Sequence, residues 1–262
     1  MTNVKPKKNL GQHFLTDENI ARKIVNSLTD KNGNLIEIGA GTGVLSKYFL
    51  QKENFIIFEI DSESVEFLKT NFNELQNKII DKDFLQHDLL QLFNNHKFNI
   101  IGNFPYNISS QIFFKILDNR NYVGEIVCMI QKEVAQRIAE KPGSKTYGIL
   151  SVLLQAFYNI DYLFTVNETV FYPPPKVKSA VIRLTRNKTE NLNCNEKLFF
   201  KIVKTAFNQR RKMLRTSLKS IVDLSKINTN FQTKRPEQLS VNDFVELTNL
   251  CEKYTPPNLS YL

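Results

Sequence analysis

The sequence predicts a Rossmann-like, doubly wound α/β domain with a mainly parallel sheet, followed by a small helical domain. Between residues 17 and 185, short apolar runs alternate with segments of helical periodicity. A polar, asparagine-rich stretch at residues 186–196 has little to bury and is typical of a linker. Beyond it there is no convincing strand, and the apolar spacing predicts three or four helices. We therefore predict two domains, residues 1–188 and residues 189–262.

Seven segments of the first domain have the length and composition of strands. They are residues 34–38, 54–60, 79–83, 98–103, 124–131, 161–166 and 179–185. The apolar run in each is about the right length to be buried on both faces of a sheet. The helices expected between them include residues 19–27, 62–72 and 109–117. Thr16 or Asp17 can cap the first helix, and Asp61 or Ser62 can cap the second.

Composition and charge limit the classes of function. The 262 residues are 42% hydrophobic, enough for a packed core, and carry a net charge of +9 in a few basic stretches, which indicates a surface that faces a polyanion. Cys128, Cys194 and Cys251 are far apart and odd in number, so neither disulfides nor a metal site are expected. No apolar run is long enough to cross a bilayer, and none follows the lysine-rich start. We expect a cytoplasmic protein without membrane contact.

The first chemical signal is the glycine-rich loop Gly39-Ala40-Gly41-Thr42-Gly43, which follows the strand that carries Glu37. Glycines let the backbone turn sharply and lie against a ligand that a Cβ atom would exclude. Dinucleotide-binding enzymes use similar loops, but with the spacing Gly-x-Gly-x-x-Gly. The spacing here is Gly-x-Gly-x-Gly. Together with Glu37 at the strand end, it favours S-adenosylmethionine over a dinucleotide.

Two further strands end in acids that a nucleoside-containing cofactor needs. Glu59 or Asp61 can accept both ribose hydroxyls, and Glu59 is preferred because Asp61 lies where a helix cap is needed. After the third strand, Asp83 can accept the amino hydrogens of the cofactor's adenine, and Phe84 can pack on its ring. Any one of these acids is equally well an ordinary loop carboxylate. Three at the carboxyl ends of successive strands are harder to dismiss, because those ends meet at one edge of the sheet.

The fourth strand runs into Asn103-Phe104-Pro105-Tyr106, which resembles the Asp/Asn-Pro-Pro-Tyr motif of methyltransferases that act on ring-conjugated amino groups. The lone pair of such an amino group is delocalised, so the nitrogen is a poor nucleophile. The Asn103 side-chain oxygen and the Pro105 carbonyl can accept its two hydrogens, and Tyr106 can stack on the base. Positioning then supplies most of the catalysis, without a general base. The alternative is a simple turn, since Asn and Pro are common turn residues.

With these segments in place, the chain resembles the ribosomal RNA adenine dimethyltransferases, and within them the bacterial small-subunit enzymes, over nearly its whole length. Three further segments carry the resemblance: residues 10–15 (LGQHFL), 171–180 (FYPPPKVKSA) and 207–215 (FNQRRKMLR). They resemble, in that order, the segment that folds over the cofactor, the second substrate-side loop and the basic signature of the C-terminal domain.

The resemblance implies a class I methyltransferase fold and S-adenosylmethionine-dependent dimethylation of two adjacent adenines near the 3′ end of 16S rRNA, with a role in ribosome biogenesis. The implied cofactor contacts are His13, Leu15, Gly39, Glu59, Asp83 and Asn103. The implied position of the target adenine is between Tyr106 and Phe171. His13 departs from the Asn that is common in the family, and Phe104 from the commoner Leu. A monomer is expected, with the small ribosomal subunit as its partner.

Two basic stretches without any acid indicate RNA contact: residues 172–188 carry five basic side chains, and residues 201–219 carry seven. On a helical projection, one face of the second stretch is basic and the opposite face is apolar. The basic face holds Lys201, Lys204, Arg211, Lys212, Arg215 and Lys219, and the apolar face Val203, Phe207, Leu214, Leu218 and Ile221. A solvated charged face is the ordinary alternative, but such faces mix signs. We therefore expect the RNA-binding residues to be Lys204, Arg211, Lys212 and Arg215.

Three other functions fit part of the pattern. A 23S rRNA adenine methyltransferase that confers antibiotic resistance shares the two loops, but its C-terminal region differs from residues 210–212 and 236–240 here. A non-catalytic ribosome-assembly or transcription factor of this fold is expected to lack Glu59, Asn103 or Tyr106, and all three are present. A DNA adenine methyltransferase is disfavoured because the tail does not resemble a sequence-reading module.

Overall fold

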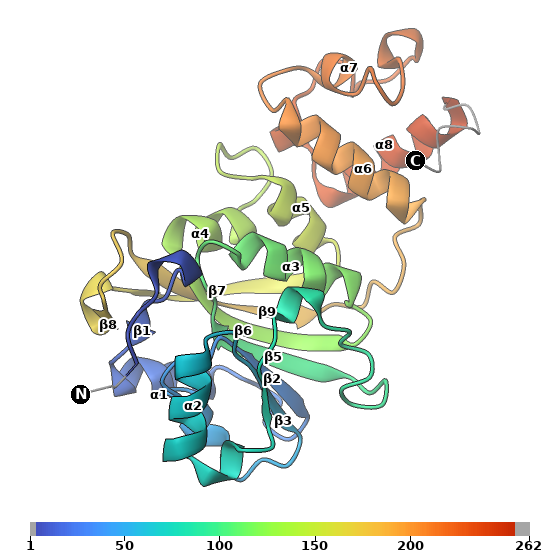
Figure 1. The fold of residues 1–262 in the computed structure, drawn as a ribbon. Coiled ribbons are helices and arrows are strands. Elements are labelled where there is room, and N and C mark those ends of the chain that lie inside the picture. The colour runs from blue at the N-terminus through green and yellow to red at the C-terminus, as the bar shows by residue number, and fades with distance from the viewer. Residues whose placement is uncertain (1–3, 255–262) are drawn as a thin grey trace. The chain divides into compact units, whose positions relative to one another are not determined.

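The computed structural model describes residues 4–254, which form two compact units (Figure 1). The first unit extends to residue 135 and resumes at 159–186, and the second contains 136–158 and the chain from 187. The segment 136–158, expected in the first domain, therefore belongs with the C-terminal helices. Its helix α5 (Ile149–Gln155) packs on α6 (Glu196–Asn208) and α8 (Val241–Tyr254). A functional division at residue 188 stays a prediction.

A seven-stranded sheet forms the centre of the first unit, in the order β4–β3–β2–β5–β6–β9–β7. The strands are β2 (Asn34–Ile38), β3 (Phe55–Phe58), β4 (Ile79–Ile80), β5 (Phe98–Asn103), β6 (Val123–Gln131), β7 (Tyr158–Val166) and β9 (Ser179–Arg186). β2 to β6 pair in parallel, and β9 pairs antiparallel with β6. The predicted sheet and its seven strands are confirmed. β4 is shorter than predicted because the chain turns at Asp83, which caps a 3₁₀ turn.

The three helices predicted for the first unit are confirmed to within one residue at each end. They are α1 (Glu18–Asn26), α2 (Ser62–Asn71) and α3 (Ser109–Asp118). Asp17 caps α1, and Asp61 caps α2 by accepting from the Glu63 N–H at 3.3 Å. A further helix, α4 (Lys132–Ala139), follows β6 directly. Of the helices within residues 4–254, none has the length and apolar character needed to cross a membrane.

A short antiparallel ribbon, which the sequence pattern does not predict, joins the N-terminal segment to the loop before β9. Its strands are β1 (Phe14–Leu15) and β8 (Phe171–Tyr172), with Leu15 opposite Phe171. Next to it, the N–H and the hydroxyl of Thr16 both donate to the Val170 carbonyl at 2.9 Å. Two-residue strands are too short to show an alternating pattern. The ribbon places residues 10–15 beside residues 171–180.

Aromatic side chains form the core of the second unit. The Phe207 ring lies 6.2 Å from Tyr147 and 6.1 Å from Phe244, centroid to centroid, and all three side chains are buried. As predicted, the described part of the tail, residues 187–254, contains helices and no strand. The 3₁₀ turns of the two units are Lys8–Leu10, Ser46–Phe49, Asn73–Leu75, Phe84–Gln86, Glu168–Val170, Leu224–Lys226 and Pro236–Gln238.

The prediction of one basic helix face over residues 201–219 is wrong. Helix α6 ends at Asn208, and α7 (Leu214–Ser217) begins after a turn. The Leu214 N–H donates to the Lys234 carbonyl at 2.8 Å, so a distant segment supplies the acceptor that a continuous helix would have provided. The predicted exposure nevertheless holds. The five residues of the predicted apolar face are buried, and the four proposed RNA contacts are exposed.

Candidate active site

The glycine-rich loop after β2 adopts a backbone that favours glycine. Gly39, Gly41 and Gly43 have φ angles of +72°, +55° and +77°, all in the left-handed region. A Cβ atom on Gly41 would lie 2.8 Å from the Phe14 ring, so the N-terminal segment approaches this loop only because the position is a glycine. Phe14, in the segment expected to fold over the cofactor, therefore packs directly against the glycine-rich loop.

Two adjoining cavities lie beside this loop. The first, of about 650 Å³, is lined by residues 10–15, the glycine loop and residues 103–106. The second, of about 750 Å³, extends to Asp83 and Phe84. Five residues line both cavities: Leu10, Gly39, Glu59, Ile60 and Pro105. Together they have the mixed polar and apolar lining of a small-molecule site.

Glu59 lies at the junction of the two cavities and is 5% exposed. Its carboxylate accepts three backbone N–H groups, from Gly41 at 2.8 Å and from Ile60 and Asp61 at 2.9 Å. Burial raises the pKa of this carboxyl, and the N–H groups of Asp61 and Gly41 oppose the shift. Two carboxylate oxygens offer about four acceptor positions, so with three N–H donors already bound Glu59 keeps room for about one hydroxyl group.

Glu37 is a second buried acid that lines the first cavity. It accepts a hydrogen bond from the Ser46 hydroxyl at 2.7 Å. Burial raises the pKa of Glu37 to about 8; the Ser46 hydrogen bond opposes this shift and the charge of Glu59 adds to it. A cationic ligand in this cavity would favour the ionised form of both acids.

In the second cavity, Asp83 is partly engaged in its own turn. Its Oδ1 accepts from the Leu85 N–H at 2.9 Å and its Oδ2 from the Gln86 side-chain amide at 3.3 Å. Each oxygen keeps capacity to accept another hydrogen. Phe84 is buried edge-on against Phe58, with ring centroids 5.4 Å apart. An amino acceptor and an aromatic side chain therefore line the same cavity.

The corner of residues 103–106 lines the first cavity at the end of β5. The Asn103 side-chain nitrogen donates to the His13 carbonyl at 2.9 Å. Because a carbonyl only accepts, this contact fixes the amide and leaves the Asn103 oxygen as the free acceptor. The Pro105 carbonyl already accepts from the Ile108 N–H at 3.2 Å, although it can accept once more. Within residues 4–254, the neighbouring Phe104 carbonyl accepts no hydrogen bond.

Tyr106 is held by the first residue of β9, and His13 is held by the loop before that strand. The Tyr106 hydroxyl is hydrogen-bonded to the Ser179 hydroxyl, and burial raises its pKa. The His13 ring lies 5.5 Å from the Tyr106 ring, and its Nδ1 is 2.7 Å from the Pro173 carbonyl. The hydrogen must therefore be on Nδ1. His13 stands where the family commonly has Asn. It contacts Asn103, Tyr106 and the substrate-side loop.

Phe171 is not brought beside Tyr106. It is 4% exposed, is part of the hydrophobic core and lines a third cavity with Phe14 and Thr42, whereas Tyr106 lines the first. Leu15, opposite Phe171 in the ribbon, lines both of these cavities. Because the two rings line different cavities, a base stacked between Tyr106 and Phe171 stays a prediction.

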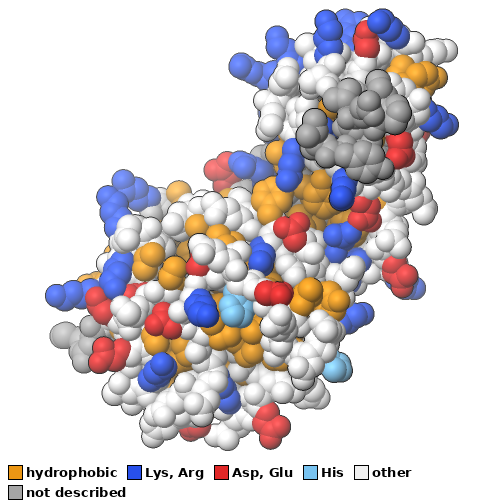
Figure 2. Space-filling view, turned by 45° about the vertical axis from the view of Figure 1, so that its right-hand side comes forward, with side chains coloured by type: hydrophobic (Ala, Val, Ile, Leu, Met, Phe, Trp, Pro, Cys, Tyr) orange, Lys and Arg blue, Asp and Glu red, His pale blue; other side chains and the backbone are white. Residues whose placement is uncertain are grey.

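The remaining predicted residues are distributed as follows. The first cavity brings together His13, Leu15, Gly39, Glu59, Asn103, Pro105 and Tyr106, and the second contains Asp83. Lys204, Arg211, Lys212 and Arg215 are exposed in the second unit, and Lys and Arg side chains gather along its top edge in Figure 2. Ser179 and Lys7, whose contacts hold site residues, were missed, because such contacts link positions far apart in sequence.

The sheet order, the glycine-loop cavity and the asparagine corner define a class I S-adenosylmethionine-dependent methyltransferase. A family model described as ribosomal RNA adenine dimethylase matches residues 3–253. The chain belongs to this family, which confirms the resemblance found in the sequence.

Known proteins similar to this chain agree with that assignment. Ribosomal RNA small subunit methyltransferase A of Flavobacterium johnsoniae is 56% identical over 255 residues, which cover 96% of this chain and 98% of that protein. A solved dimethyladenosine transferase from Plasmodium falciparum has a TM-score of 0.75 at 26% identity, covering 92% of this chain and 98% of that one. The 23S rRNA methyltransferase ErmE, at a TM-score of 0.64 and 20% identity over 90% of this chain and 99% of its own, shares the fold.

Proposed function

We propose that this protein transfers methyl groups from S-adenosylmethionine to the exocyclic amino groups of two adjacent adenines near the 3′ end of 16S rRNA, during assembly of the small ribosomal subunit. The observation that carries the proposal is the orientation of Asn103. Its side-chain oxygen is left free by the contact with His13, and it lines the same cavity as Gly39 and Glu59. That is where an amino group must meet a bound methyl donor.

The residues of the two cavities fit S-adenosylmethionine. Glu59, at the junction, would accept a ribose hydroxyl, and Asp83 and Phe84 would hold the adenine in the second cavity. The methionine end would lie in the first cavity against His13, Leu15 and Gly39, where the buried acids complement its positive charge. When bound, the cofactor supplies an electrophilic methyl group on a positively charged sulfur.

The chain's own groups position the target. The Asn103 oxygen accepts one amino hydrogen, and a main-chain carbonyl of the corner accepts the other, which favours the pyramidal and nucleophilic form of the nitrogen. Pro105 was the predicted carbonyl; the Phe104 carbonyl beside it is the less committed acceptor. Tyr106, anchored by Ser179, stacks on the base. No residue needs to act as a base, since the proton can pass to water after the methyl transfer.

The second unit would hold the RNA. Its exposed Lys204, Arg211, Lys212 and Arg215 lie on α6, α7 and the turn between them, and would contact phosphates rather than bases. The target adenine must be unpaired or flipped to reach the first cavity, which requires a few kcal/mol at most. The proposal includes a monomer in the cytoplasm, and a single peak at the monomer mass in size-exclusion chromatography is expected.

Incubation of unmodified small and large ribosomal subunits with methyl-labelled cofactor, followed by nucleoside analysis, tests the proposal. We expect labelled dimethyladenosine in the small-subunit RNA only, and none with the Asn103→Ala variant. Label in the large subunit would instead favour the 23S rRNA enzyme. Binding of the small subunit without any label in its RNA would favour the non-catalytic assembly factor.

A further inference from the structure

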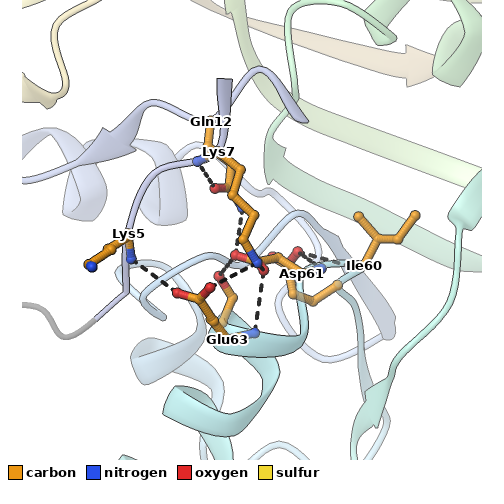
Figure 3. Close-up of polar contacts among 8 residues, drawn as sticks. Lys5, Lys7, Gln12, Ile60, Asp61 and Glu63 are labelled. Carbon is orange, nitrogen blue, oxygen red and sulfur yellow. Dashed lines mark hydrogen bonds and ion pairs between the residues drawn. The ribbon is translucent and has the colours of Figure 1, made fainter. Parts of the chain in front are cut away.

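The N-terminal segment of the first unit is tied to one buried carboxylate. The Asp61 side chain is fully buried and forms an ion pair with the Lys7 ammonium group. Its other oxygen accepts from the Gln12 side-chain amide at 2.9 Å. Lys7 and Gln12 thus bind the same side chain, each about fifty residues away from it in sequence (Figure 3).

Three further contacts close the segment on itself and on the start of α2. The Gln12 side-chain oxygen accepts from the Lys7 N–H at 2.7 Å. The Lys7 ammonium group also lies 3.2 Å from a Glu63 oxygen, and the other Glu63 oxygen is 3.4 Å from the Lys5 N–H. Residues 7–12 therefore form a loop whose two ends meet at Asp61 and Glu63.

Helix capping alone does not explain this arrangement. As the cap of α2, Asp61 accepts from the Glu63 N–H at 3.3 Å and from the Ser64 hydroxyl at 3.0 Å, and both groups are local. The contacts to Lys7 and Gln12 are additional. Although burial raises the pKa of Asp61, hydrogen bonds from Lys7, Gln12 and Ser64 bring it below its ordinary value. The carboxylate is therefore charged at neutral pH when it binds the N-terminal segment.

The same carboxylate residue is next to the cofactor cavities. Residues 10–15 line the first cavity, and they share residues 10–12 with the closed loop. The Asp61 N–H donates to the Glu59 carboxylate at 2.9 Å, and Glu59 in turn binds the Gly41 N–H. A continuous series of contacts thus joins Lys7 and Gln12 to the residues that would hold the ribose.

We propose that Asp61 is a positioning residue that, through Lys7 and Gln12, holds residues 10–15 closed over the cofactor, so that these contacts set the rate at which the cofactor leaves. The proposal rests on the proposed function in taking S-adenosylmethionine as the ligand. A cofactor enclosed by residues 10–15 leaves only when they move away, and that movement requires the ion pair to open. Lys7 lines neither cavity and is not needed for the methyl transfer, whereas Gln12 is itself part of the segment that lines the first cavity.

The test compares Lys7→Met with Lys8→Met. Lys8 is exposed, forms no ion pair within residues 4–254 and loses the same charge when substituted. The dissociation constants and dissociation rates of S-adenosylmethionine and S-adenosylhomocysteine are measured with the full-length protein by calorimetry and stopped flow. We expect Lys7→Met to raise the dissociation rate by about 3- to 10-fold, the usual range for loss of a charge-assisted pair with one buried partner. Lys8→Met should match the parent protein.

Two further readouts separate positioning from general destabilisation. KM for the cofactor should rise in Lys7→Met, while kcat and KM for the small subunit stay unchanged. Lys7→Arg, which keeps the positive charge, should restore the parent rate. Because salt weakens an ion pair with one exposed partner, the dissociation rate should increase with ionic strength more steeply in the parent than in Lys7→Met.

The outcomes also separate this proposal from the function on which it rests. If the parent protein binds neither form of the cofactor, both fail. If the parent binds but Lys7→Met and Lys8→Met have equal dissociation rates, only the positioning role is overturned. A fall in kcat without a change in cofactor dissociation would likewise overturn it. Thermal unfolding of each variant without cofactor verifies that the comparison is made between folded proteins.

Discussion

The cofactor side and the target side of the candidate site are assembled to different degrees. On the cofactor side, Glu59 accepts three backbone N–H groups, and Lys7 and Gln12 tie the N-terminal segment to Asp61. On the target side, Tyr106 is held by Ser179, but Phe171 is buried in the core and lines another cavity. One side is thus ready for its ligand, whereas the other lacks its second aromatic side chain.

This difference indicates an order of events. A preformed cofactor site needs little reorganisation on binding, which favours affinity. The target side would be completed only when the RNA shifts the ribbon of β1 and β8, so that part of the RNA binding energy is used to assemble the catalytic site. Because β1 contributes Leu15 to the first and the third cavity, such a shift would also press on the bound cofactor.

The largest effect is expected for Asn103→Ala, which removes the side-chain amide acceptor of the corner. Loss of one preorganised hydrogen-bonding group of this kind reduces kcat by about 100- to 1,000-fold. The cofactor dissociation constant should change much less, because most of the cofactor contacts come from other residues. Single-turnover methylation of unmodified small subunits, with calorimetry of cofactor binding, measures both. Equal losses in kcat and cofactor affinity would contradict the division of the site into two sides.

How far the sequence predicts the site depends on the range of the contacts. β2 and β5 have their predicted bounds. Each strand ends where its apolar residues give way to residues of the candidate site, as at Asn103. Asp61 caps α2, as the sequence predicts, and the choice of Glu59 as the ribose acceptor stays a prediction. Local patterns, such as a strand end, a glycine turn or a helix cap, therefore predict the elements around the cavities, and the cofactor contacts themselves stay predictions.

The contacts that were missed are those between distant segments. The ribbon has two residues in each strand, and its pairing of Leu15 with Phe171 leaves no periodic signal. The break between α6 and α7 depends on the Lys234 carbonyl, twenty residues along the chain from the Leu214 N–H that it binds. The burial of Phe171 was missed for a related reason. The resemblance of a motif predicts which residue faces the base, but it does not predict where that residue lies before the base binds.

A pair of aromatic substitutions tests whether Phe171 is a stacking residue or a core residue. Tyr106→Leu and Phe171→Leu each remove a ring but keep apolar volume, so cavity effects stay small. Stacking contributes about 1 to 3 kcal/mol per base. If the ribbon shifts as proposed, both variants should lower kcat/KM for the small subunit by about 5- to 100-fold at saturating cofactor. A loss in Tyr106→Leu alone, with only thermal stability reduced in Phe171→Leu, would leave Phe171 in its core role.

Glu37 provides a pH-dependent test of how the cofactor side is built. Its pKa is raised from 4.5 to about 8 by burial, so on raising the pH the unfolded chain ionises first and the folded state loses stability up to about pH 8. Without cofactor, the parent should lose about 2 to 3 kcal/mol more than Glu37→Gln between about pH 6 and about pH 9. Denaturant unfolding measures this, with the exposed Glu53→Gln as control. Parallel stability curves for parent and Glu37→Gln would mean that Glu37 is not held neutral.

The smallest effect is expected for the double variant Arg211→Gln, Arg215→Gln. This variant separates RNA binding from both the cofactor side and the target side of the site. Removing each arginine–phosphate ion pair should reduce the slope of log K against log salt by about 0.7 to 1, and the two substitutions together should weaken RNA binding by about 3- to 10-fold near physiological salt. The double variant Lys226→Gln, Lys253→Gln removes the same charge from exposed positions elsewhere in the second unit. Filter binding over a salt series distinguishes the two. Since neither pair touches the cavities, cofactor affinity should be equal in all three proteins, and equal salt slopes in both double variants would exclude Arg211 and Arg215 from the RNA interface.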